Sequence, residues 1–226
     1  MRVRALLFTG VAVATSLTVA AEAAPVKKSC NLIVDAKGDT NDDYTVQGQK
    51  SPVGFPESGS VDLVGGDLAN DGKTITAVVK LDAIDPNEQK AINRRYVVQF
   101  KPAGAKYPIL MAALFEPTAT TYNFGYYGPS SGVGASTDPV YNYPGTATGK
   151  VDGNTIVISA SLADMASTDN VGPIRPGTKI SSIQVTSFRR MLGARVPPGY
   201  TVYEADVATT KLTYNAGAPS CVKIGG

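Results

Sequence analysis

Residues 60–81, with the sequence SVDLVGGDLANDGKTITAVVKL, decide the fold of this chain. From Thr74 to Leu81 the odd positions are apolar and the even positions are mostly polar, which is the two-residue period of a strand with one buried face. The preceding Asp71-Gly72 pair favours a tight turn, because hairpin turns need residues that tolerate positive φ. The segment therefore predicts an antiparallel β-hairpin.

A second segment, residues 146–160, repeats this pattern. Asp152-Gly153-Asn154 separates two limbs, and in the second limb Ile156 and Ile158 alternate with more polar neighbours. Short helical turns are expected at residues 85–95 and 162–166. Further strand-like segments lie at residues 29–34, 96–101, 107–115, 120–127, 179–189 and 200–214.

These segments predict an all-β fold, an antiparallel two-sheet β-sandwich with about nine to eleven strands and at most short helical turns. Gly, Pro and Asp turns separate the strands, and no long amphipathic helix interrupts them. A closed barrel is the alternative. The unequal lengths and uneven spacing of the strands favour the sandwich.

The first 23 residues have the composition of a secretory signal peptide. Arg2 and Arg4 precede a run of small apolar residues, and Ala21-Glu22-Ala23 matches a small-x-small cleavage site. A membrane anchor is the alternative, but the apolar run is at the lower edge of the ~17–25 residues that a span requires. We therefore expect a secreted, extracellular protein in which residues 24–226 form a single domain, without a membrane span in the mature chain.

The two cysteines, Cys30 and Cys221, lie near the two ends of that domain. An exported chain meets an oxidising environment, so we expect them to form a disulfide, with two free thiols as the alternative. Because the bridge closes nearly the whole domain into one loop, the chain-entropy estimate of its stabilisation is about 5 kcal/mol.

The composition excludes several classes of function. The chain has no histidine, so it cannot form a Ser-His-Asp triad or a His-ligated zinc site. Its formal net charge is +2, without the concentrated basic field that nucleic-acid binding needs. It also has no tryptophan, the side chain that most often stacks on sugars.

Two sets of short motifs resemble those of a broad group of exported bacterial β-sandwich domains, similar to family 9 carbohydrate-binding modules and to DOMON domains. The first set comprises Asp35-x-x-Gly38-Asp39, Val61-Asp62-Leu63 and the Asp71–Thr76 turn. The second is the hairpin 148–156. The resemblance implies a β-sandwich. It implies no specific ligand, because the chain lacks the tryptophan of the sugar-binding members and the histidine of the haem-binding members.

The acidic segment after residue 34 is a candidate metal site. Asp35, Asp39 and Asp43, with Asn41 and Asp42 between them, offer closely spaced oxygen ligands around Gly38. Hard oxygen ligands suit Ca²⁺, which is the only cofactor we consider. The spacing is not that of an EF-hand, and the alternative is a solvated turn in which Asp and Asn bond their own backbone.

A group of tyrosines is the candidate ligand-binding site. Tyr127, Tyr141 and Tyr143 lie at the end of a strand and in the long Gly- and Ser-rich segment after it. Tyrosine in such a segment offers rigid contact area with a polar tip. On the strand itself, Tyr122 and Tyr126 share one face, which we expect to be packed inside.

A basic group at Arg189, Arg190 and Arg195, with Arg94 and Arg95 elsewhere, could bind a carboxylate or phosphate in bidentate fashion, but we expect these arginines at solvated strand ends. For the chain as a whole we expect a non-catalytic exported binding or interaction module, with a glycan or a protein at the cell surface as its partner. A carboxylate-based glycoside hydrolase, which needs no histidine, is one alternative. A purely structural envelope protein is the other.

Overall fold

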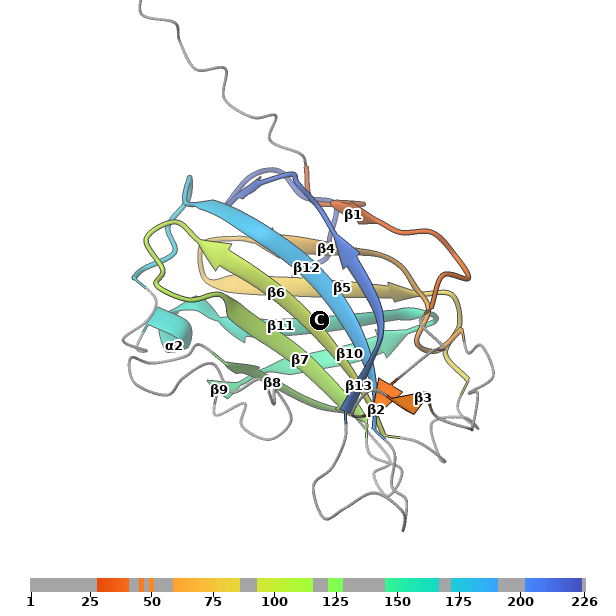
Figure 1. The fold of residues 1–226 in the computed structure, drawn as a ribbon. Helices are drawn as coiled ribbons and strands as arrows, with labels where there is room; N and C mark the ends of the chain where they lie inside the picture. The colour runs from red at the N-terminus through yellow and green to blue at the C-terminus, as the bar shows by residue number, and fades with distance from the viewer. Residues whose placement is uncertain are drawn as a thin grey trace, which may run out of the picture.

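The structure is a computed structural model, and two antiparallel sheets stack in it as layers of a β-sandwich (Figure 1). The predicted fold is thereby confirmed. The described strands comprise nine of five or more residues and five of two residues. The structure describes residues 28–40, 45–46, 49–50, 59–85, 93–115, 122–127, 145–166, 172–190 and 202–224. The expected signal peptide lies outside these residues.

The smaller sheet has five strands in the order β1-β4-β5-β11-β10, and both predicted hairpins belong to it. Asp71 and Gly72 turn the first hairpin, and Gly72 has a φ of +89°. Gly153, with a φ of +57°, turns the second. The strands are β1 (Ile33–Val34), β4 (Leu63–Asn70), β5 (Thr74–Leu81), β10 (Thr148–Asp152) and β11 (Thr155–Ser161).

The larger sheet has seven strands in the order β13-β12-β6-β7-β8-β9, with β14 paired to β12. Every paired strand in it is antiparallel to its neighbours. The strands are β6 (Asn93–Pro102), β7 (Ile109–Phe115), β8 (Asn123–Tyr127), β9 (Gly145–Thr146), β12 (Lys179–Arg190), β13 (Val202–Thr209) and β14 (Tyr214–Asn215).

Two further elements complete the description. The strands β2 (Thr45–Val46) and β3 (Gln49–Lys50) pair only with each other. The helix α2 (Leu162–Ala166) follows β11 and confirms the helical turn expected at residues 162–166. Within the described parts of the chain, no helix is long and apolar enough to cross a membrane.

The core lies between the two sheets and is formed by their facing side chains. On β5, the odd positions from Ile75 to Leu81 are at most 2% exposed, as the alternation predicts. From the larger sheet, Tyr96, Phe100 and Met111 are fully buried against them. Burial of such side chains stabilises by about 1.5–3 kcal/mol each, so this interface is the main source of the fold's stability.

The outer face of β5 is less exposed than the alternation predicts. Thr74 and Lys80 are partly exposed, but Thr76 and Val78 are buried. The Thr76 hydroxyl lies 2.9 Å from the Ser159 hydroxyl on β11, so this polar residue is buried with a partner. The centre of this outer face is therefore covered rather than solvated.

A bulge in β12 changes which residues face the core. Strict alternation would place Ile180 and Ile183 on opposite faces, yet both are at most 1% exposed. The register against β6 shifts between Ser181 and Gln184, and Ser182 has a φ of +51°. The extra residue of the bulge shifts the alternation of side chains by one position, so both isoleucines face the core.

The expectation of a helical segment up to residue 95 is wrong at its end. β6 begins at Asn93, and Arg94 and Arg95 pair with β7 and β12. The expectation of solvated arginines is also wrong, because Arg94, Arg95 and Arg189 are 2–4% exposed. Strand pairing on both sides of β6 outweighs the local helix signal and draws these arginines into the sheet.

Candidate functional site

Three carboxylates converge at one edge of the sandwich. Asp35 and Asp39 belong to the segment that follows β1, and Asp206 belongs to β13 of the other sheet. One oxygen from each carboxylate lies within 4.8 Å of the other two. Two of the three residues predicted as metal ligands are therefore brought together, and the third, Asp43, lies outside the described residues.

The segment carrying Asp35 and Asp39 is held against the smaller sheet by three contacts. The Asp35 amide donates to the Val64 carbonyl at 3.3 Å. The Gly38 amide donates to Asp62 Oδ2 at 2.8 Å. The Lys37 ammonium pairs with Asp82 at 2.7 Å, and its charge also acts on Asp62. These contacts fix the two carboxylates beside β4 and β13.

Asp206 reaches the cluster from the larger sheet. It pairs with Ser187 on β12 and is 7% exposed. Its Oδ2 accepts a hydrogen bond from the Leu63 amide at 2.7 Å, and its Oδ1 accepts one from the Val207 amide at 2.7 Å. Both bonds favour the carboxylate anion and oppose the effect of burial, and they hold the Asp206 side chain in place.

Burial and mutual repulsion raise the pKa values of Asp35, Asp62 and Asp206. Desolvation is the largest cause for Asp35, whose pKa rises to about 6, and the charges of Asp206, Asp39 and Asp62 raise it further. Desolvation also raises the pKa values of Asp62 and Asp206. Several carboxylates held close together repel one another, and binding a cation or a proton reduces this repulsion.

Asp206 was not among the residues predicted for this site. It is 171 positions from Asp35 in sequence, and no local motif joins the two. The available signal is its position in a strand: an aspartate within the core-facing residues of VYEADVAT is unusual, because buried carboxylates require partners. That signal marks Asp206 as special, but only the fold shows what it meets.

A pocket of about 240 Å³ lies on the outer face of the smaller sheet. Val78 and Val157 line it from neighbouring strands, and the chain around Cys221 borders it. Its charged lining residues are Asp67, Lys80, Lys150, Asp152 and Lys223. It therefore combines an apolar floor with a charged rim.

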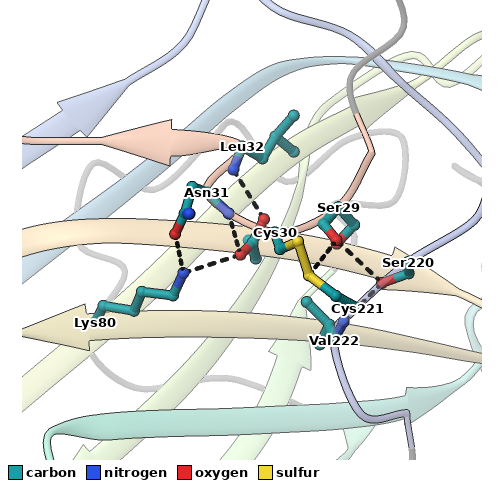
Figure 2. Close-up of a disulfide and its surroundings, with 9 residues drawn as sticks. Ser29, Cys30, Asn31, Leu32, Lys80, Ser220, Cys221 and Val222 are labelled. Atoms are coloured by element: carbon teal, nitrogen blue, oxygen red, sulfur yellow. Dashed lines mark hydrogen bonds and ion pairs between the residues drawn. A yellow bond between two sulfur atoms is a disulfide. The ribbon is translucent and has the colours of Figure 1, made fainter.

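The disulfide between Cys30 and Cys221 forms one wall of this pocket and confirms the predicted pairing (Figure 2). Their Cα atoms are 5.6 Å apart. The Cys221 amide donates to the Ser29 carbonyl at 3.0 Å, and Ser29 and Ser220 form a parallel bridge. The two ends of the domain are thus joined beside β4 and β5.

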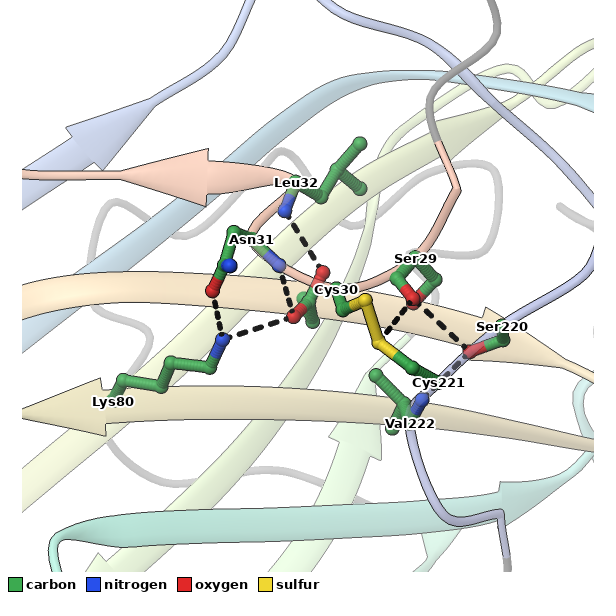
Figure 3. Close-up of polar contacts among 9 residues, drawn as sticks. Ser29, Cys30, Asn31, Leu32, Lys80, Ser220, Cys221 and Val222 are labelled. Atoms are coloured by element: carbon green, nitrogen blue, oxygen red, sulfur yellow. Dashed lines mark hydrogen bonds and ion pairs between the residues drawn. A yellow bond between two sulfur atoms is a disulfide. The ribbon is translucent and has the colours of Figure 1, made fainter.

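Next to the disulfide, hydrogen bonds join Asn31, Leu32 and Lys80 to one of the carboxylates that line the pocket (Figure 3). Asp67 is 1% exposed and accepts hydrogen bonds from the amides of Asn31 at 2.6 Å and Leu32 at 2.9 Å. The Lys80 ammonium donates to Asp67 at 3.1 Å and to Asn31 Oδ1 at 2.7 Å. Asp67 and Lys80 are therefore engaged with each other and with the backbone.

The tyrosines divide into two groups. Tyr126 is 6% exposed, and Tyr122 packs against the core beside Phe115 and Phe124, as expected for that face of the strand. Of the predicted ligand-binding residues, Tyr127 is the last residue of β8. Tyr141 and Tyr143 lie outside the described residues, so the three stay a prediction.

Comparison of the chain with models of protein families and with curated proteins finds no match.

Proposed function

We propose that this protein is a non-catalytic, exported binding module that engages an anionic glycan of the cell surface through the pocket beside the disulfide. The observation that supports the proposal most is the pocket's rim. After Asp67 and Lys80 have paired, Lys150, Lys223 and Asp152 are the charged residues left on it. Two ammonium groups against one carboxylate give this surface a net positive charge.

The two lysines are available for a ligand. Neither Lys150 nor Lys223 forms an ion pair with any residue that the structure describes. They approach the pocket from different parts of the fold, since Lys150 lies on β10 and Lys223 follows the disulfide. Two separated ammonium groups across an apolar floor suit an acidic sugar, whose carboxylate or sulfate can accept charge-assisted hydrogen bonds while the ring covers the floor.

The geometry of the carboxylates supports binding rather than glycoside hydrolysis. A glycosidase holds the scissile bond between two carboxyl groups, about 5–5.5 Å apart in retaining enzymes and farther apart in inverting ones. In the acidic cluster, Asp206 is 7% exposed and both of its oxygens accept hydrogen bonds from backbone amides. Its side chain is therefore fixed in place and largely shielded from solvent. In the pocket, Asp67 accepts three hydrogen bonds and is 1% exposed, so its oxygens are already engaged.

A retention experiment tests the proposal. The purified protein is passed over immobilised polygalacturonate, heparin and isolated cell wall, with neutral cellulose as the reference matrix. We expect retention on at least one acidic matrix and its loss on addition of salt. The variant Lys150→Glu/Lys223→Glu should lose this retention. The variant Lys106→Glu/Lys211→Glu, which makes the same charge change at exposed positions away from the pocket, should keep it.

Two outcomes contradict the proposal. Retention on none of the acidic matrices removes the anionic glycan as ligand. Equal retention by the two lysine variants removes the pocket as its site. The variant Tyr127→Ala/Tyr141→Ala/Tyr143→Ala is the third arm: if it alone loses retention, the tyrosines form the site instead.

A further inference from the structure

Two carboxylate oxygens in and beside the acidic cluster are buried and have no hydrogen-bond partner among the residues that the structure describes. They are Asp35 Oδ2 and Asp62 Oδ1. Asp62 is 5% exposed, and its other oxygen already accepts the Gly38 amide. A buried carboxylate oxygen without a donor is costly, because it has lost its water and gained nothing in exchange. A ligand that coordinates oxygen would remove this cost.

Asp62 stands beside the three converging carboxylates. The charge of Asp62 contributes to the raised pKa values of Asp35 and Asp206, and the charge of Asp39 contributes to the raised pKa of Asp62. It comes from a different element, the residue before β4, so it is an independent contribution from the smaller sheet. With Asp62, the cluster draws on three separate parts of the chain: the segment after β1, the residue before β4, and β13. Asp62 and Asp206 are buried, and Asp39 is exposed.

We propose that Asp35, Asp39 and Asp206, with Asp62 beside them, form a Ca²⁺-binding site that joins the segment after β1 to β13. Three carboxylates supply part of the six to eight oxygen ligands that Ca²⁺ takes, and water and backbone carbonyls can supply the rest. The site goes beyond the proposed function and does not rest on it, because its residues are not those of the pocket.

The ligand chemistry fits Ca²⁺ better than its competitors. The three converging oxygens lie within 4.8 Å of one another, so a single ion can contact all three. Mg²⁺ dehydrates reluctantly and keeps several waters, so it is usually bound through one or two carboxylates rather than by a set of protein ligands. Zinc and copper favour nitrogen and sulfur ligands, and this cluster offers oxygen alone.

The test is thermal denaturation of EDTA-treated protein, measured with and without about 10 mM CaCl₂, a concentration in excess of the expected Kd. Exported calcium modules bind with Kd values on the order of 10⁻⁴–10⁻³ M, so we expect Tm to rise by roughly 3–10 °C. Calorimetric titration should give one site. NaCl of equal ionic strength should leave Tm unchanged, and MgCl₂ should raise it less than CaCl₂ does.

The variants are chosen so that folding does not obscure the result. Asp39 is exposed, so Asp39→Asn should fold normally and lose the calcium response. Asp35→Asn and Asp206→Asn should lose it as well. Asp152→Asn, at an exposed position outside the cluster, is the matched control and should respond like the wild type.

Three results would overturn the proposal. The first is a wild-type protein that shows neither a rise in Tm nor binding heat with CaCl₂. The second is an Asp39→Asn protein that responds as strongly as the wild type. The third is an equal rise with MgCl₂, which contradicts the assignment to Ca²⁺. Because each readout is metal binding, it is independent of glycan retention, and the two proposals can fail separately.

Discussion

The Asp206 carboxylate accepts a hydrogen bond from the Leu63 amide at 2.7 Å, and this bond joins the two sheets across 143 positions of sequence. Leu63 begins β4 of the smaller sheet and is fully buried. Two neighbouring contacts fasten the same segment to the larger sheet: the Tyr96 hydroxyl donates to the Ser60 carbonyl, and the Ser187 hydroxyl donates to the Val61 carbonyl, each at 2.6 Å. The entry of β4 into the sandwich is therefore fixed by polar groups of the opposite sheet.

The first prediction concerns this bond. Asp206→Ala leaves the buried Leu63 amide without its acceptor, which should lower the free energy of unfolding by about 1–3 kcal/mol. Urea denaturation in the presence of EDTA measures the change apart from any metal. Asp152→Ala, at an exposed hairpin position, should change the urea midpoint little. Equal midpoints for Asp206→Ala and wild type would contradict the structural role given to Asp206.

The second prediction concerns pH. The pKa of Asp35 is raised from its ordinary value of 3.8 to about 6 in the folded protein. The folded state therefore binds the proton more tightly than the unfolded state, and its contribution to stability is full below about pH 3.8 and is lost as pH rises through 6. The variant Asp35→Asn has no carboxylate at this position and escapes this loss. In EDTA, the urea midpoint of the variant minus that of the wild type should therefore increase from pH 5 to pH 7. A constant or falling difference would contradict the shift.

The third prediction concerns the disulfide. Cys30→Ser/Cys221→Ser opens a link of 191 positions and should cost about 2–5 kcal/mol of stability. Guanidinium denaturation of the oxidised wild type and the double variant measures the difference. The same loss should follow reduction of the wild type, with no further loss on reduction of the variant. A variant as stable as the oxidised wild type would show that the bridge adds nothing.

The fourth prediction concerns close packing at Gly66 on β4. A Cβ there would lie 2.5 Å from Val185 Cγ2 of the other sheet and 3.1 Å from the Val78 carbonyl oxygen. Gly66→Ala should therefore force the sheets to shift and cost about 1–3 kcal/mol. Gly172→Ala is the control, because nothing lies within 4 Å of a Cβ at that position. Similar thermal midpoints for the two variants would contradict the packing described here.

The parts of the fold that follow from local rules could be predicted from the sequence. The alternation in residues 74–81 and the Asp71-Gly72 turn give a hairpin in any β fold, because each depends only on adjacent residues. The disulfide follows from the position of two cysteines in a chain whose N-terminal sequence predicts export. The helical turn at residues 162–166 was likewise a local pattern, and the structure confirms it.

The parts that depend on distant partners could not be predicted. The bulge at Ser182 is set by pairing with β6, so the shared facing of Ile180 and Ile183 has no local signature. The burial of Arg94 and Arg189 follows from their pairing across two strands that are far apart in sequence. Sequence proximity groups Asp35 with Asp39, and the structure adds Asp206, which is 171 positions from Asp35 in sequence.

The most direct test of the proposed function is amide chemical-shift mapping of the isotope-labelled protein during titration with a polygalacturonate oligomer. We expect the largest shifts on the residues that line the pocket, at 78–80, 150–157 and 221–223. Shifts confined to other strands, or none at concentrations where the polymer retains the protein, would contradict binding at this pocket.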